Sequence, residues 1–221
     1  MGLDLEPLGR AKPGHESEWI ELTDLIYEGE ELSQSQIDRR NAITIQSFED
    51  IGAPCVGTDD EANRWAIGLA KSNGHPGSDA EIVEELKGHN AVALMIGRCD
   101  GVAKFSRGHT ANDVDETSFR GQLLETCGDL LDEETITQAW QQVFRPEEAV
   151  EYGEKLLALL KNGKPPAAPP EAKKKGFFDK LFPPRPPAAK APIEDQRAIV
   201  EAAGKWFIYW GKKGHPIWAN F

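Results

Sequence analysis

Residues 162–193 constrain the fold more than any other stretch of this chain, because they are rich in proline, alanine and lysine. Proline lacks a backbone N–H and holds φ at about −65°, so such a stretch favours extended polyproline II over helix or sheet. Its one apolar cluster is FFDKLF at 177–182. The sequence therefore predicts an acidic, α-rich globular domain at 1–163, a linker with a short aromatic motif at 164–192, and an aromatic C-terminal helix at 193–221.

Charge divides the chain at the same place. Residues 1–163 hold 14 Lys and Arg against 32 Asp and Glu, a net charge of −18, whereas residues 164–221 hold 11 against 5, a net charge of +6. An acidic body repels nucleic acid and anionic lipid and favours basic partners. We therefore expect no nucleic-acid partner, and the basic tail has its nearest counter-charge on its own body.

Size and composition indicate a cytoplasmic protein. No apolar run approaches the ~20 residues that span a bilayer, and the N-terminus lacks the basic and apolar regions of a secretory signal. The cysteines Cys55, Cys99 and Cys127 are odd in number and widely spaced, which argues against a disulfide framework.

The first 163 residues are patterned mostly as helices, with a short strand in residues 3–7 that ends at Pro7. Thr58 with Glu61, and Ser78 with Glu81, match the capping box that marks a helix start. Apolar residues elsewhere recur at helical spacing. We expect helices at 16–32, 33–48 (where Ile43 and Ile45 also fit a strand), 58–73, 78–87, 117–131, 133–144 and 146–161.

Residues 90–106 have a different pattern. The uncharged run AVALMIG precedes Asp100-Gly101, and VAKF follows. Asp-Gly between two apolar runs is a strong hairpin signal, because a type I′ turn needs positive φ at both central residues. The predicted fold class is therefore α+β, predominantly helical, with a small antiparallel β-hairpin here.

The C-terminal region carries an excess of aromatic residues. Nine of the 18 aromatic residues lie in 173–221, and a helix from Ile193 to about Trp210 would place Trp206 and Trp210 on one face. About thirty residues cannot fold alone, and so much aromatic surface must be buried. We expect the tail to pack on its own body or on another molecule.

The expected partner-binding residues are apolar side chains of the linker and the tail. The linker motif follows three lysines, which is typical both of a short protein-docking motif and of a peripheral membrane anchor. The charge of the body disfavours a membrane surface. The predicted partner-binding set is Phe177, Phe178, Leu181, Phe182, Trp206, Trp210 and Trp218.

Catalytic signatures are weak. Cys99, followed by His109, Asp113 and Asp115, contains the groups of a thiolate nucleophile with a base and an orienting carboxylate. Closeness in sequence does not bring them into contact, so a turn cysteine and a solvated histidine are the favoured interpretation. Metal-ligand spacings and a complete phosphate-binding loop are missing from the sequence, so no cofactor or metal is predicted.

These observations favour a cytoplasmic protein–protein interaction or regulatory module that binds a protein partner or a second copy of itself. The alternative is a small hydrolase- or transferase-like enzyme with its site around 99–115. A third hypothesis is peripheral membrane association through 177–182.

Overall fold

The computed structural model describes residues 2–27, 30–106, 117–162 and 189–220. In these residues the fold is helix-rich α+β with small antiparallel sheets, which confirms the predicted fold class. The strands are β1 (Asp4–Pro7), β2 (Arg10–Ala11), β3 (Thr44–Ile45), β4 (Val143–Phe144) and β5 (Ile217–Asn220). The helices are α1 (Glu16–Tyr27), α2 (Gln34–Ala42), α3 (Ser47–Asp50), α4 (Asp60–Ser72), α5 (Asp79–Glu85), α6 (Glu133–Gln138), α7 (Pro146–Asn162) and α8 (Ile193–Lys212), with 3₁₀ turns η1 (Val92–Met95) and η3 (Gly121–Thr126).

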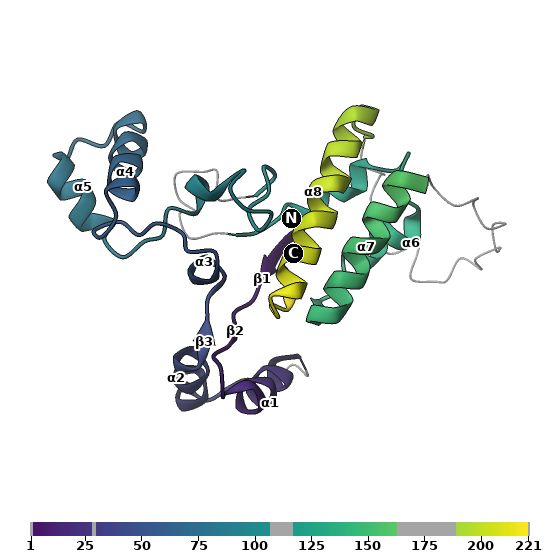
Figure 1. The fold of residues 1–221 in the computed structure, drawn as a ribbon, viewed down its shortest axis with the longest axis horizontal. Coiled ribbons are helices and arrows are strands. Elements are labelled where there is room, and N and C mark those ends of the chain that lie inside the picture. The colour runs from purple at the N-terminus through teal and green to yellow at the C-terminus, as the bar shows by residue number, and fades with distance from the viewer. Residues whose placement is uncertain (1, 28–29, 107–116, 163–188, 221) are drawn as a thin grey trace, which may run out of the picture.

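The elements form three groups (Figure 1). Helices α7 and α8 lie side by side with the sheet β1–β5–β4 and form the main body. The α4–α5 pair projects on one side, and the α1–α2 pair lies below. No helix of the described ranges is long and apolar enough to cross a membrane.

The main core is built on the contact between α7 and α8, the most extensive contact between any two elements of the described chain. Phe207 of α8 is at its centre, with ring centroids 5.2 Å from Phe144 and 4.8 Å from Tyr152. Polar tips of the buried rings are satisfied: the Tyr152 hydroxyl donates to the Thr135 carbonyl at 2.9 Å. Aromatic area buried with its polar groups paired is strongly stabilising.

Residues 193–220 belong to the same core as the residues before the linker. Trp206 and Trp210 are fully buried, and their indole N–H groups donate to the carbonyls of Thr117 and Gly101. Strand β5 then pairs with both β1 and β4 in antiparallel register, with Leu5 opposite Ala219. The tail thus supplies the central strand of the sheet as well as one of the two core helices.

The predicted hairpin in 90–106 is wrong. Its first apolar run forms η1, and neither Asp100 nor Gly101 has the positive φ that a type I′ turn requires. The side chains of Tyr209 and Trp210 pack on Gly101, so tertiary contacts replace strand pairing. The antiparallel pairing occurs instead among β1, β5 and β4 and between β2 and β3.

Several helix boundaries also differ from prediction. Helix α1 ends at Tyr27, before the predicted end at residue 32. The predicted 33–48 helix is divided: α2 ends at Ala42, and Thr44–Ile45 form β3, which is the strand alternative for this segment. Helix α4 begins after Asp59, and the Thr58 hydroxyl donates to the Cys55 carbonyl rather than capping the helix. The capping box of Ser78 and Glu81 is confirmed. The helix expected at 117–131 is reduced to η3, because Phe119 pairs with Leu5 of β1. The predicted 133–144 helix ends at Gln138, and its last residues form β4.

Glycines allow α7 and α8 to approach closely, and replacing Gly153 tests this contact. A β-carbon on Gly153 would lie 2.7 Å from the Gly204 carbonyl oxygen and 3.0 Å from the Ile208 amide nitrogen. Since both are backbone atoms, the helices would have to separate. Gly153→Ala should lower the free energy of unfolding by about 1–3 kcal/mol, measured by urea denaturation.

Gly68 on α4 provides the matched control. It is an exposed helical glycine whose β-carbon would meet nothing within 4 Å, so Gly68→Ala should raise the free energy of unfolding by about 0.5–1 kcal/mol through helix propensity alone. If both substitutions stabilised the protein, the close approach of α7 and α8 would be contradicted.

Candidate functional site

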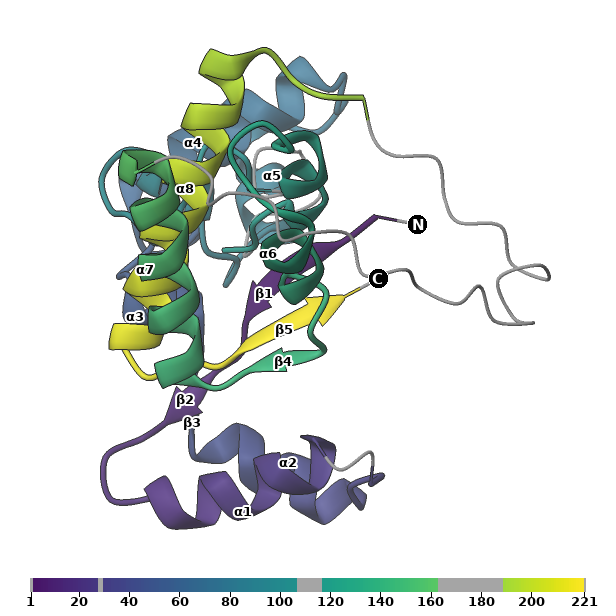
Figure 2. The same ribbon diagram turned by 90° about the vertical axis from the view of Figure 1, so that its right-hand side faces the viewer.

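Strands β2 and β3 connect the main body to a helical arm formed by α1 and α2 (Figure 2). The arm is held by a buried polar network: the Trp19 indole donates to the Thr44 hydroxyl at 2.9 Å, and that hydroxyl donates to the Arg40 carbonyl at 2.6 Å. The Arg40 guanidinium lies 5.7 Å from the centre of the Trp19 ring, a cation–π geometry. The network fixes the orientation of α1 relative to α2.

A groove of about 260 Å³ runs along α1 where the arm meets the main body. One wall is a face of α1, and the other is made by residues 145–147 at the start of α7 and by residues 214–216 in the turn before β5. In Figure 2 α1 lies beneath the lower end of α7 and strands β4 and β5. The residues that line the groove are Ala11, Glu16, Trp19, Ile20, Thr23, Asp24, Tyr27, Arg145, Pro146, Glu147, Gly214 and Pro216.

The turn after α8 shapes the second wall. Gly214 takes φ of 84°, and the amide of His215 donates back to the Trp210 carbonyl at 3.0 Å. A glycine in this left-handed conformation is the usual end of an α-helix. The chain then reverses, so that Pro216 faces the groove and Ile217 begins β5.

Groove residues of α1 form two rows along the helix. The inner row, Trp19, Thr23 and Tyr27, is repeated every four residues and is mostly buried, with Thr23 only 1% exposed. The outer row, Glu16, Ile20 and Asp24, has the same spacing and faces solvent, and Ile20 is 50% exposed. Residues four apart lie above one another on a helix. An exposed apolar side chain is therefore flanked along α1 by two carboxylates.

The rim of the groove is acidic. Glu16, Asp24 and Glu147 oppose the single cation Arg145, which leaves a net charge of −2 among the lining residues. Hydrogen bonds from the backbone N–H groups of Glu16 itself and of Gly14 lower the pKa of Glu16, so this carboxylate is ionised at neutral pH. The Arg145 guanidinium is 3.7 Å from the Asp24 carboxylate, and both side chains are well exposed.

An ionic cluster around Asp50 supports the second wall from behind. Arg10 donates to the Asp50 carboxylate at 2.7 Å, and Lys213 and His215 approach it at 3.3 and 3.2 Å. The other ring nitrogen of His215 lies 2.7 Å from the Leu8 carbonyl. One carboxylate thus connects β2, α3 and the turn after α8.

The cluster shifts the titration of its members. Burial opposes ionisation of Asp50, but hydrogen bonds from Arg10, His215 and Lys213 outweigh it and hold its pKa well below the usual range. Burial lowers the pKa of His215, which is 0% exposed, and its bonds to Leu8 and Asp50 oppose that effect. Both ring nitrogens face acceptors, and a neutral ring can donate to only one of them.

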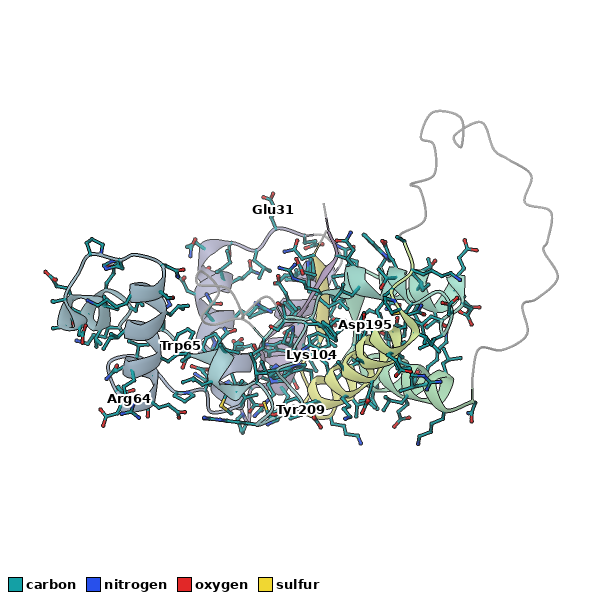
Figure 3. The ribbon with its side chains drawn as sticks, turned by 90° about the horizontal axis from the view of Figure 1, so that it is seen from above. Glu31, Arg64, Trp65, Lys104, Asp195 and Tyr209 are labelled. Carbon is teal, nitrogen blue, oxygen red and sulfur yellow. The ribbon has the colours of Figure 1, made fainter. Side chains whose placement is uncertain are left out.

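Of the predicted catalytic residues, Cys99 alone lies among the residues that the structure describes. Cys99 lies near Tyr209 of α8, which is labelled in Figure 3. Burial and the neighbouring thiol raise the pKa of Tyr209 to about 12. His109, Asp113 and Asp115 fall outside the described residues, so the nucleophile hypothesis stays a prediction. The described residues contain no group of three or more His, Cys, Asp or Glu arranged to hold a metal ion.

Three of the predicted partner-binding residues lie within the described part of the chain. Trp206 and Trp210 were expected at a partner surface, but both are fully buried in the core and unavailable to a partner. Trp218 is half-buried on β5, opposite Glu6 and Val143. The linker motif, Phe177, Phe178, Leu181 and Phe182, lies outside the described residues.

The groove was not predicted from the sequence. Trp19 and Ile20 are adjacent apolar residues of α1, but only Trp19 is buried. The regular spacing of Glu16, Ile20 and Asp24 was the available signal. Comparison of the chain with protein-family models, with curated proteins and with solved structures gives no match.

Titration of His215 should make stability depend on pH. Its folded-state pKa lies below its ordinary value of about 6.5, so the unfolded chain binds the proton more readily and stability is lost as pH falls below about 6.5. Between pH 7.5 and 5.5 the free energy of unfolding should fall by at most about 1.4 kcal/mol, because pH 5.5 lies one unit below the ordinary pKa of histidine. Urea denaturation at the two pH values measures this difference.

The His215→Gln variant should lose this part of the pH dependence, whatever its absolute stability, because glutamine does not titrate. His75→Gln is the control: His75 lies beside Glu85 and outside the Asp50 cluster, so the part of the pH dependence assigned to His215 should remain. Equal pH dependence in His215→Gln and in the unaltered protein would contradict the assignment.

Proposed function

We propose that this protein is a cytoplasmic protein–protein interaction module whose groove beside α1 binds a basic segment of a protein partner. The observation that carries the proposal is the outer row of α1, in which half-exposed Ile20 lies between the carboxylates of Glu16 and Asp24. Ile20 offers apolar area to a partner side chain, and the carboxylates select positive charge beside it.

The charge of the groove favours this partner over other macromolecules. Phosphates of a nucleic acid and anionic lipid headgroups would meet the net negative rim and be repelled. A basic protein segment gains Coulomb attraction, which raises its association rate more than its final affinity. The cysteines Cys55, Cys99 and Cys127 are all unpaired, which supports a reducing compartment.

The linker motif at 177–182 stays a predicted second contact for a partner, and self-association remains a competing form of the same proposal. In either form the partner segment has to bring an apolar side chain to Ile20 and positive charge to the carboxylates of the groove. Trp206 and Trp210 are removed from that role because the core already buries them.

A pair of isoleucine substitutions tests the groove. Ile20→Lys places a cation on the groove wall, whereas Ile37→Lys places one on α2 at a similarly exposed position (39% against 50%) outside the groove. The probe is a fluorescein-labelled peptide of lysines and leucines, followed by fluorescence anisotropy at low and moderate salt. Ile20→Lys should weaken binding at least about tenfold, from lost apolar contact and added repulsion, and Ile37→Lys should weaken it only slightly.

Binding should also fall with rising salt, because the attraction at an exposed rim is screened. A peptide with glutamate in place of lysine should not bind. Equal weakening by both lysine substitutions, or equal binding of the acidic peptide, would overturn the proposal that the groove selects a basic partner.

A further inference from the structure

We infer that the groove reads a particular sequence pattern, basic–x–apolar–x–basic, in an extended segment of the partner. This inference rests on the proposed function and deepens it by naming the form and spacing of the ligand. The central apolar side chain contacts Ile20, and the two basic side chains contact Glu16 and Asp24.

The spacing of the outer row carries the inference. Consecutive residues of an α-helix rise by about 1.5 Å, so Glu16, Ile20 and Asp24 are about 6 Å apart and the two carboxylates about 12 Å apart along the axis. In an extended segment, side chains at alternate positions point the same way and are separated by about 6.6 Å, so positions i and i+4 are about 13 Å apart. The spacing of the outer row of α1 therefore matches the spacing of alternate side chains in an extended segment over three side chains.

The size of the groove favours an extended ligand over a helical one. A helical ligand could match the same spacing with side chains at i, i+4 and i+8, but a helix with its side chains is about 10 Å wide along its whole length. The groove holds about 260 Å³. That space admits a few side chains of an extended segment passing along the rim.

The opposite wall leaves recognition to side chains. Pro146 and Pro216 have no N–H to donate, and the carbonyl of Pro216 already accepts from the amide of Leu8 at 2.8 Å. An extended ligand therefore cannot use this wall as the edge of a sheet, because a sheet edge supplies backbone donors and acceptors in alternation. Specificity then depends on the outer row of α1 facing the ligand.

Arg145 competes with the ligand for one carboxylate. Its guanidinium is 3.7 Å from Asp24, and it is 60% exposed. A ligand cation at this end must displace Arg145 from Asp24. At the other end, Glu16 accepts a hydrogen bond from the Gly14 amide and lies near His15, and it forms no ion pair with Lys or Arg among the described residues. Removing Arg145 should therefore strengthen binding of the matching ligand.

The experiment uses the full-length protein and three peptides of identical composition, with acetylated and amidated ends. The first contains Ala-Lys-Ala-Leu-Ala-Lys-Ala, with a lysine two residues on each side of leucine. The second has its two lysines adjacent at one end. The third has a lysine four residues on each side of leucine, and alanines are added to the first two so that all three have equal length and composition. Isothermal titration calorimetry should show the first binding at least fivefold more tightly than the others, and Arg145→Ala should tighten it about two- to fivefold.

A charge reversal tests the register directly. Glu16→Lys should weaken the first peptide at least fivefold, and a peptide with glutamate in place of the lysine at one end should recover affinity for this variant but not for the unaltered protein. Glu21→Lys is the matched control, because Glu21 is an exposed carboxylate of α1 that does not line the groove. It should cause only a small, salt-sensitive loss.

The outcomes separate the two proposals. If the three peptides bind equally and Ile20→Lys still abolishes binding, the groove binds basic segments but the inferred pattern is overturned. Preference for the third peptide would overturn the extended form in favour of a helix. If none of the three peptides binds, both the pattern and the proposed function fall.

Discussion

The close packing of α7 against α8 is the contact on which the rest of the structure depends. It brings the two helices together across glycines, since a β-carbon on Gly153 or Gly204 would collide with the facing helix. The aromatic face of α8 then fills the space between this pair and the sheet, with Phe207 in contact with Phe144, Tyr152 and Trp206. Because α8 follows the proline-rich linker, the domain cannot be completed until the end of the chain has folded back.

A second constraint joins this core to the arm. Asp50 binds groups from β2 and from the turn after α8, so the base of the arm and the end of the core helix share one carboxylate. Removing water from an ion pair is costly unless several partners satisfy it, and Asp50 has three. Since the same turn places Gly214 and Pro216 in the groove wall, the geometry of the groove depends on this cluster.

The structural features that could be predicted from the sequence were mainly those that depend on residues close together in the chain. The capping box of Ser78 and Glu81 and the apolar period of 193–210 involve contacts within one or two turns, and both elements form as expected. The Asp100-Gly101 hairpin failed because distant residues decide that segment: the Gly101 carbonyl accepts from the Trp210 indole, 109 positions away. Trp206, Phe207 and Trp210 were rightly expected to be buried, but no local pattern could say that the body buries them.

The groove likewise combines a local feature, which the sequence contains, with a contact between distant parts of the chain, which it does not reveal. Glu16, Ile20 and Asp24 stand on one line of α1 by their spacing alone, yet a row of this kind on an isolated helix would be an ordinary solvent-exposed face. Single exposed apolar residues are common on protein surfaces and carry no meaning by themselves. Ile20 differs from Ile37 and Ile193, which are also exposed, because residues 145–147 and 214–216 form a second wall opposite it. The second wall, which comes from parts of the chain more than a hundred residues away, is what turns an amphipathic helix into a candidate binding site.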